Sequence, residues 1–355
     1  MQGGKVRGFV VSSGCANAVT GQRGLEDAWK MSKTVDNHAP RGPTTAAEVG
    51  GTLVMSTGVI GQHLPIEKIT TSIPPLLSSL SSTPEAWLGL AKAFMTTDTF
   101  PKLRTREFKI NDQLIKLVGI DKGAGMIHPN MGPPHGTLLG VIATDAKVHP
   151  EALQKALGWA VDRSFNSITV DGDMSTNDTV LCLANGAAGT SEGGSSGGMK
   201  EISEKGTPEE YEVFKNELTG FAEELAQLVV RDGEGATKFV TVRVEVSFDV
   251  PGGLWSGRKT ELMSECVSPT WIRTHRRMRW RERWLPLSRR LLWSRRPCTV
   301  KVSHGGVGDG KCLLSPRMLT LGSSEQTPTG GESCVPCEST AVYLPVPVFH
   351  SHDHD

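Results

Sequence analysis

The sequence predicts an α/β fold, because strand-like and helix-like segments alternate along its first two thirds. Three segments carry this prediction. Residues 6–11 form a short run rich in β-branched residues that ends in a Ser-Ser-Gly turn, which is typical of a strand. Residues 209–230 place apolar side chains three and four positions apart, the period of an amphipathic helix. Residues 238–246 alternate valine with polar residues, the period of a half-buried strand.

The other elements follow from local pattern in chain order. We expect further strands at 51–55 and 138–143, and further helices at 24–31, 84–94 and 150–159. The segment 185–198 is rich in Gly and Ser and is predicted to be a loop. Beyond Val246 no sustained helix or strand period is found, so residues 247–355 are expected to be irregular.

Charge divides the chain at the same place. The 38 Lys and Arg residues balance the 38 Asp and Glu residues overall. Residues 1–246 contain 23 basic and 28 acidic residues, a balance of −5, whereas residues 247–355 contain 15 and 10, a balance of +5. No run approaches the ~20 apolar residues that a membrane helix needs. We therefore expect neither a membrane nor a nucleic acid as partner, although residues 273–296 contain ten Arg.

The most informative motif is a Gly-rich run at 121–140 that leads into an apolar segment. It contains Gly123 and Gly125, but no Gly-Lys-Ser/Thr follows, so it matches a nucleotide-binding loop poorly. Within this run Thr137 follows Gly136 at the start of the expected strand. Such a Thr can attack the preceding carbonyl, and cleavage would leave its own α-amine as a general base. From the residues alone, a plain turn and a self-cleaving nucleophile both remain open.

Two clusters are candidate metal sites, and both are incomplete. Asp171, Asp173 and Asp178 begin like a calcium loop, but the twelfth position is Cys182 rather than an acid. Near the C-terminus, Cys334 and Cys337 form half of a zinc signature whose second half lacks the required spacing. We therefore expect no metal.

A series of short motifs occurs in one order between residues 13 and 238. They are 13–18 (SGCANA), 56–61 (STGVIG), 95–99 (MTTDT), 122–131 (KGAGMIHPNM), 137–145 (TLLGVIATD), 164–173 (SFNSITVDGD), 175–179 (STNDT) and 232–238 (DGEGATK). The sequence thereby resembles the ornithine acetyltransferase family, the bifunctional glutamate N-acetyltransferases of arginine biosynthesis, in their fungal mitochondrial form. The resemblance covers about residues 5–246.

The resemblance implies a layered α/β fold with mixed sheets and a precursor that cleaves itself between Gly136 and Thr137. The products would be an α chain, 1–136, and a β chain, of which 137–246 matches the family, assembled as an α2β2 heterotetramer. The reaction would move acetyl from N-acetylornithine to glutamate, with acetyl-CoA as a second acetyl donor and no other cofactor. The family also implies the mitochondrial matrix, although no transit peptide is visible in this chain.

The resemblance further implies a role for individual residues. Thr137 would be the nucleophile and also contact substrate. Thr57 and Gly58 match the pair that stabilises the oxyanion of an acyl transfer. The substrate-binding residues of the family match Thr96, Lys122 and Glu234 in this sequence.

This sequence departs from the family in two places that affect the prediction. The nucleophilic Thr of the family lies eleven residues after the matched Lys, whereas Thr137 lies 15 residues after Lys122, as though 133–136 were inserted. The Arg-, Trp- and Cys-rich tail, 247–355, matches nothing in the family and is typical of a disordered segment or of translated non-coding sequence. Two hypotheses follow: a self-cleaving acetyltransferase, or a catalytically inactive family-like fragment whose basic tail binds partners.

Overall fold

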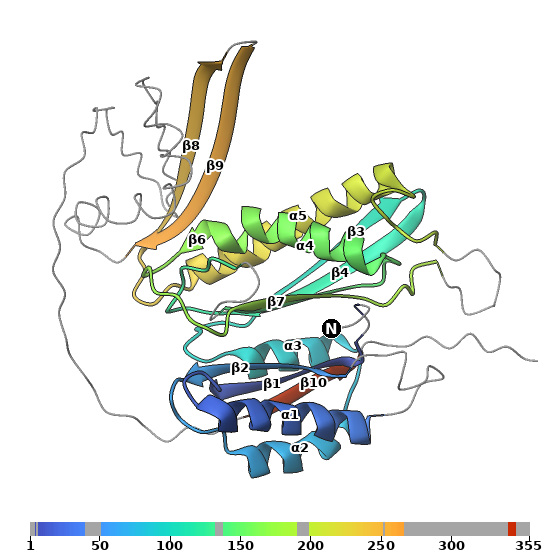
Figure 1. The fold of residues 1–355 in the computed structure, drawn as a ribbon, viewed down its shortest axis with the longest axis vertical. Helices are drawn as coiled ribbons and strands as arrows, with labels where there is room; N and C mark the ends of the chain where they lie inside the picture. Colours follow the sequence, from blue (N-terminus) through green and yellow to red (C-terminus); the bar gives the residue numbers. More distant parts are fainter. Residues whose placement is uncertain are drawn as a thin grey trace, which may run out of the picture. The chain divides into compact units, whose positions relative to one another are not determined.

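The structure, a computed structural model, describes residues 4, 6–39, 51–131, 138–189, 199–250, 253–265 and 340–345. By its internal contacts the chain divides into two compact units, residues 1–232 with 337–355, and residues 233–336. The larger unit contains all of the described helices and two of the sheets (Figure 1). The predicted α and β chains are products of cleavage rather than folding units, so that division stays a prediction.

Five α-helices lie in the described part of the larger unit. They are α1 (Gly21–His38), α2 (Ile66–Ser78), α3 (Pro84–Phe94), α4 (Pro150–Arg163) and α5 (Pro208–Arg231), with a short 3-10 turn at Phe165–Ser167. The helices predicted at 24–31, 84–94, 150–159 and 209–230 are thereby confirmed, whereas α2 was not predicted. None of the helices in the described ranges is long and apolar enough to span a bilayer.

The strands form two sheets in the larger unit and a hairpin in the smaller one. The first sheet has the order β10-β1-β2 and the second β3-β4-β5-β7. Their bounds are β1 (Gly8–Cys15), β2 (Leu53–Val59), β3 (Lys102–Ile110), β4 (Gln113–Lys122), β5 (Leu139–Thr144), β6 (Ile168–Thr169), β7 (Thr179–Ala184), β8 (Lys238–Val250), β9 (Gly253–Glu265) and β10 (Thr340–Pro345). Each sheet combines parallel and antiparallel pairs, so the predicted α/β class with mixed sheets is confirmed.

Helices α1 and α2 cover one face of the first sheet, and α3 lies between the two sheets (Figure 1). Strand β1 shows why. Alternate side chains of a strand point to opposite faces, so Val10 packs with α1 and α2 while Phe9 and Val11 pack with α3. A strand that is buried on both faces has an almost continuously apolar sequence. The apolar residues within 6–11 fit this rule.

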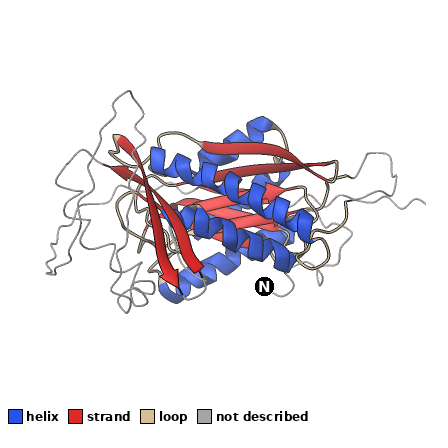
Figure 2. Ribbon diagram, turned by 90° about the horizontal axis from the view of Figure 1, so that it is seen from above, coloured by secondary structure: helices blue, strands red, loops and turns tan. Residues whose placement is uncertain are grey.

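The outer face of the second sheet is covered by α5. Seen from above, helices lie over the strands beneath them (Figure 2). Gly119 of β4 allows this close approach, because a Cβ there would lie 2.6 Å from side-chain carbons of both Phe221 and Leu225. Phe221 and Leu225 belong to the apolar stripe that predicted α5, and both are fully buried.

The expectation that residues 247–355 are irregular is wrong for the described parts of that segment. Strand β8 continues past Val246 to Val250 and pairs antiparallel with β9, and β10 pairs antiparallel with β1. Strands pair through backbone hydrogen bonds, which do not depend on the side-chain pattern. A segment without alternating apolar residues can therefore pair with a neighbouring strand. Residues 266–339 and 346–355 lie outside the described residues, and with them the Arg- and Trp-rich block, Cys334, Cys337 and the His-containing end.

Candidate active site

The candidate site begins where the parallel strands β1 and β2 end. Gly58 has φ +113°, and a Cβ on it would lie 2.3 Å from the carbonyl carbon and oxygen of Gly14. Glycine is therefore required at this position for steric reasons. The preceding residue, Thr57, is 1% exposed, and its hydroxyl has no hydrogen-bond partner in the part of the chain that the structure describes. A buried hydroxyl beside such a close strand contact is a fixed polar group available to a ligand.

A hydrogen-bond network joins these strand ends to the segment that precedes β7. The side-chain amide of Asn177 donates to the Asn17 side-chain oxygen at 3.0 Å and to the Ser56 hydroxyl at 3.0 Å. The Ser56 hydroxyl in turn donates to Asn17 at 2.8 Å. Three of the motifs quoted above, at 13–18, 56–61 and 175–179, therefore meet at one place although they are up to 160 residues apart.

Lys122 and Thr96, both predicted to bind substrate, are brought together at the carboxyl end of β4. The Lys122 ammonium donates to the Thr96 hydroxyl at 3.2 Å. Lys122 is only 6% exposed, and in the β4–β5 register it lies opposite Leu139, two residues after Thr137. A buried ammonium attracts carboxylates strongly because water screens it little. The pair thus forms a polar end to the second sheet.

A buried ion network holds this end of β4. The Lys102 ammonium, which is fully buried, pairs with Asp98 at 2.5 Å and with Asp232 at 2.6 Å. Asp98 also accepts from the backbone N–H groups of Gly123 at 2.7 Å and Thr96 at 3.0 Å. Although burial alone would raise the pKa of Asp98, the Lys102 ammonium and these N–H groups hold it below its usual value. The network thereby holds the backbone of Thr96 and of Gly123, the residue after Lys122, in place.

Replacing Lys102 with Met is expected to destabilise the fold by about 3–5 kcal/mol, because it leaves Asp98 and Asp232 buried without their counter-ion. Chemical denaturation followed by circular dichroism measures this loss. Lys116→Met is the matched control on the same hairpin, since Lys116 is 63% exposed and its pair with Glu107 spans 3.8 Å. An exposed pair of that kind contributes at most about 1 kcal/mol. Equal stability of the two variants would contradict a structural role for the network.

The predicted cleavage site, Gly136 and Thr137, lies outside the described residues, but the residues on either side are held firmly. The Met131 backbone N–H donates to the Asn166 side chain at 2.6 Å, and the Asn166 amide donates back to the Met131 carbonyl at 2.7 Å. On the other side, Leu138 is fully buried and its carbonyl accepts from the Thr179 N–H at 2.6 Å. The start of β5 is therefore anchored to the start of β7.

Asp171, one of the candidate metal ligands, has a different role in the structure. Its carboxylate accepts from the backbone N–H groups of Met126 at 2.5 Å and of Ile127 and Asp173 at 3.0 Å. It therefore holds the Gly-rich loop after β4 against the segment before β7. Within the described ranges, no three His, Cys, Asp or Glu side chains are grouped to hold a metal ion.

Asp178 was considered only as a metal ligand in the sequence, and the structure places it in the candidate site. It is 5% exposed, and neither carboxylate oxygen has a hydrogen-bond partner among the described residues. Burial raises its pKa to about 9, and the positive charge of Lys122 offsets this only in part. In the sequence Asp178 lies in the 175–179 motif and directly before an apolar strand, but neither signal assigns it a role in the site.

Glu234 is exposed and belongs to the smaller unit, whereas the other predicted site residues in the described ranges belong to the larger one. Its predicted contact with substrate therefore stays a prediction.

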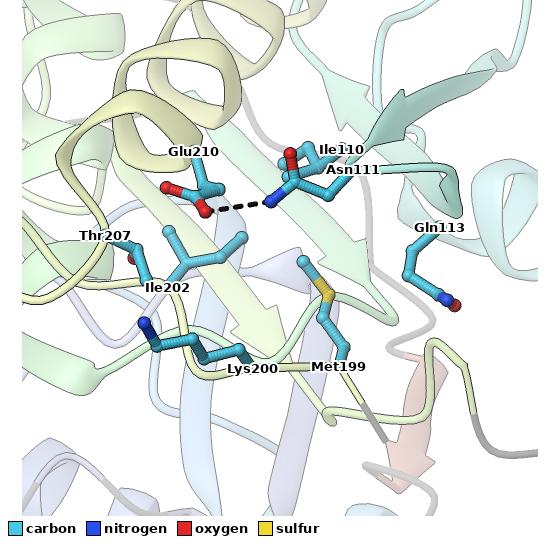
Figure 3. Close-up of a pocket in the computed structure, with 8 residues that line it drawn as sticks. All are labelled: Ile110, Asn111, Gln113, Met199, Lys200, Ile202, Thr207 and Glu210. Atoms are coloured by element: carbon cyan, nitrogen blue, oxygen red, sulfur yellow. Dashed lines mark hydrogen bonds between the residues drawn. The ribbon is translucent and has the colours of Figure 1, made fainter. Parts of the chain in front are cut away.

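A separate cavity of about 200 Å³ lies at the opposite end of the β3–β4 hairpin (Figure 3). Its lining includes Asn111 and Glu210, whose side chains form a hydrogen bond of 2.8 Å. Strand β4 is ten residues long, so this cavity lies roughly 30 Å from Lys122 at about 3.4 Å per residue. It has no part in the site described here.

Comparison with known proteins identifies the family to which the sequence is similar. A model of the ArgJ family matches residues 1–250. The chain is 65% identical over 249 residues to the arginine biosynthesis bifunctional protein ArgJ, mitochondrial, of Cryptococcus neoformans var. neoformans serotype D (strain B-3501A), covering 68% of this chain and 52% of that protein. The proteins of the same name from Laccaria bicolor and Aspergillus terreus are 59% and 55% identical over 251 and 249 residues, covering 68% and 69% of this chain and 51% and 50% of theirs.

The comparisons also show how much of this chain and of its relatives is matched. The chain spans about half the length of the curated relatives it matches. The family model ends at residue 250, close to the Val246 boundary drawn from charge and periodicity. Because a family model covers more than half of the sequence and relatives of the same name exceed 50% identity, the chain belongs to the ArgJ family.

Proposed function

We propose that this chain is an acetyltransferase that moves acetyl from N-acetylornithine to glutamate through an acetyl-Thr137 intermediate. The observation that carries the proposal is the convergence of the matched residues at one end of the second sheet. Lys122 contacts Thr96 and lies opposite Leu139. The segment 177–179 bonds to Leu138 through the Thr179 N–H and to Ser56, the residue before Thr57, through the Asn177 amide. Membership of the ArgJ family supports the same reaction.

Self-cleavage comes first in the proposed mechanism. The Thr137 hydroxyl attacks the Gly136 carbonyl, and after rearrangement and hydrolysis of the resulting ester Thr137 has a free α-amine. That amine then removes the hydroxyl proton, so the hydroxyl oxygen can attack the acetyl carbon of N-acetylornithine. The carbon–nitrogen bond breaks, ornithine leaves with the proton, and acetyl remains on Thr137. The glutamate amine attacks this ester, the carbon–oxygen bond breaks, and the proton returns to the Thr137 oxygen.

The other residues bind and orient in this mechanism. Each tetrahedral intermediate carries a negative oxygen, and the Thr57 hydroxyl and the Gly58 backbone supply donors for it. The Thr57 hydroxyl supports this role, because it is buried, has no hydrogen-bond partner among the described residues and can donate to an oxyanion. Lys122 binds a substrate carboxylate, Thr96 orients Lys122, and Glu234 binds the ornithine amine. We further propose acetyl-CoA as a second donor, an α2β2 assembly of the cleaved chains, and the mitochondrial location that the relatives' names carry.

A direct assay tests this function. The purified chain is incubated with N-acetylornithine and glutamate without acetyl-CoA, and ornithine and N-acetylglutamate are measured by mass spectrometry. We expect the two products in equal amounts, and without glutamate only a single turnover of ornithine, because acetyl stays on Thr137. Absence of both products from a folded, cleaved chain would contradict the proposal.

A second candidate function is a catalytically inactive scaffold whose basic tail binds partners. One observation favours it: the family model stops at residue 250, and the tail beyond it carries the net positive charge. The same assay separates the two functions, since the scaffold forms no product from either substrate.

A further inference from the structure

Asp178 is a buried acid of the candidate site whose carboxyl has no hydrogen-bond partner among the described residues. The residue is 5% exposed, and neither of its oxygens has a hydrogen-bond partner in the described ranges. An ionised carboxylate without partners is strongly disfavoured inside a protein. Native structures rarely keep such a group unless it meets a ligand or an ion.

The position of Asp178 connects it to the proposed chemistry. It stands between Asn177, which donates to Asn17 just after β1 and to Ser56 within β2, and Thr179, whose N–H donates to the Leu138 carbonyl. Leu138 is covalently bonded to the proposed nucleophile. Asp178 therefore lies on the segment that ties the proposed nucleophile to the proposed oxyanion donors.

The charge around Asp178 sets its protonation. From β4 the titratable group that acts on it is the Lys122 ammonium, which favours the ionised form. The residues that meet its neighbour Asn177 from β1 and β2 are Asn17 and Ser56, neither of which titrates, and β5 contributes Leu138. Burial outweighs the effect of Lys122 and raises the Asp178 pKa to about 9, so at neutral pH the group is an acid with an O–H donor.

We propose that Asp178 is a substrate-positioning residue that donates a hydrogen bond, as a neutral acid, to the carboxylate of the amino-acid substrate beside Lys122. The proposal rests on the proposed function, because that function brings an amino-acid carboxylate to Lys122. A neutral acid forms a strong charge-assisted hydrogen bond with a carboxylate. An ionised Asp178 would instead repel the substrate carboxylate and compete with it for Lys122.

Calorimetric titration of the whole chain with glutamate tests the proposal without requiring turnover. Asp178→Asn keeps the size and an N–H donor, so its Kd at pH 7 is expected to stay within about threefold of the parent value. Asp178→Ala removes the donor and is expected to raise the Kd at least tenfold, the usual effect of losing a hydrogen bond to a charged group. Asp173→Asn, on the same loop but exposed, is the matched control and leaves the Kd unchanged.

The pH dependence of the same titration is the sharper test. As pH rises through about 9 the parent loses its donor and gains a repulsive charge, so its Kd for glutamate rises, whereas the Asp178→Asn variant lacks this rise. Glutamate binding as weak in the Asn variant as in the Ala variant would overturn the proposal, since it would mean that the ionised form binds. Absence of glutamate binding in the parent would overturn it too.

Thermal unfolding provides a readout that is independent of any ligand. A carboxyl with a raised pKa binds a proton in the folded chain that the unfolded chain has already lost, so stability falls as pH rises from about 4 to about 9. The melting temperature of the parent relative to Asp178→Asn is therefore expected to fall between pH 5 and pH 8. An ionised Asp178 paired with Lys122 predicts no such fall in this pH range, because its proton is then absent from both the folded and the unfolded chain above about pH 5. Loss of acetyl transfer with both results intact would reject the proposed function but leave Asp178 as a carboxylate-binding residue.

Discussion

The Thr137→Ala variant is expected to lose self-cleavage and acetyl transfer completely. Its side chain has no nucleophilic atom, so neither the Gly136 carbonyl nor an acetyl group can be attacked. Denaturing electrophoresis measures the first effect: the parent separates into two bands, and the variant stays as one band at 38.2 kDa. Thr137→Ser keeps the hydroxyl and is expected to retain cleavage. Two bands in the Ala variant would show that cleavage does not use Thr137.

Deletion of residues 133–136 is the matched test of the insertion. It joins Gly132 to Thr137, keeps a Gly-Thr pair and restores the eleven-residue spacing from Lys122. Because Met131 is held by Asn166 and Leu138 by Thr179, extra residues between them change where the scissile carbonyl lies relative to fixed donors. We expect both the parent and the deletion variant to cleave. Cleavage of the deletion variant alone would reject the mechanism for the natural chain and identify the insertion as the cause.

The Gly58→Ala variant is expected to have the second-largest effect, a loss of at least a hundredfold in acetyl transfer. The new Cβ would lie 2.3 Å from the Gly14 backbone, so the two strand ends must separate and the Thr57–Gly58 donors must move. Removing one oxyanion donor alone costs about 10²–10³ in kcat. Single-turnover release of ornithine from N-acetylornithine measures the loss.

Gly61→Ala controls for backbone strain. Gly61 has a similar positive φ of +78°, but nothing lies within 4 Å of a Cβ placed there. Both variants force a non-Gly residue into a left-handed conformation, at a cost of about 1–2 kcal/mol. Only Gly58→Ala also separates β1 from β2. If the two variants lose acetyl transfer to the same extent, the close contact between Gly58 and Gly14 has no catalytic importance.

Helix α3 shows how much of the fold local pattern can predict. It was predicted at 84–94 and occupies the same residues. The Thr83 hydroxyl accepts from the Ala86 N–H at 3.3 Å, Pro84 starts the helix, and Leu90, Ala91 and Phe94 form its buried side. All of these signals lie within eleven residues of one another.

Helix α2 shows where local pattern failed. It contains Pro74 and Pro75, which favour the end of a helix rather than its interior. The helix forms because Ile69 and Ile73 are buried in the cluster that β1 and α1 share. The stabilising contacts come from α1 and β1, which precede α2 in the sequence, and no window of α2 itself contains them.

Some residues of the candidate site could likewise be predicted from the sequence, whereas others could not. Motif matching predicted Thr57, Gly58, Thr96 and Lys122 as site residues, and only the structure shows that Thr96 and Lys122 are in contact. The roles of these residues, and of Thr137 and Glu234, remain predictions. Asp178 was missed because a lone acid before a strand carries no distinctive pattern. Its importance depends on burial and on Lys122, which lies in another strand.

Lys102 shows the limit of local information most clearly. It starts a strand rich in charged residues, KLRTREFKI, which suggests an exposed edge, yet it is fully buried. Its second partner, Asp232, is 130 positions away. Periodicity, caps and glycine positions were enough to locate most elements and the motifs of the family, because those signals depend on neighbouring residues. Which motifs meet, and which charges become buried, depended on the packing of the two sheets around α3, because burial is a property of contacts between distant segments.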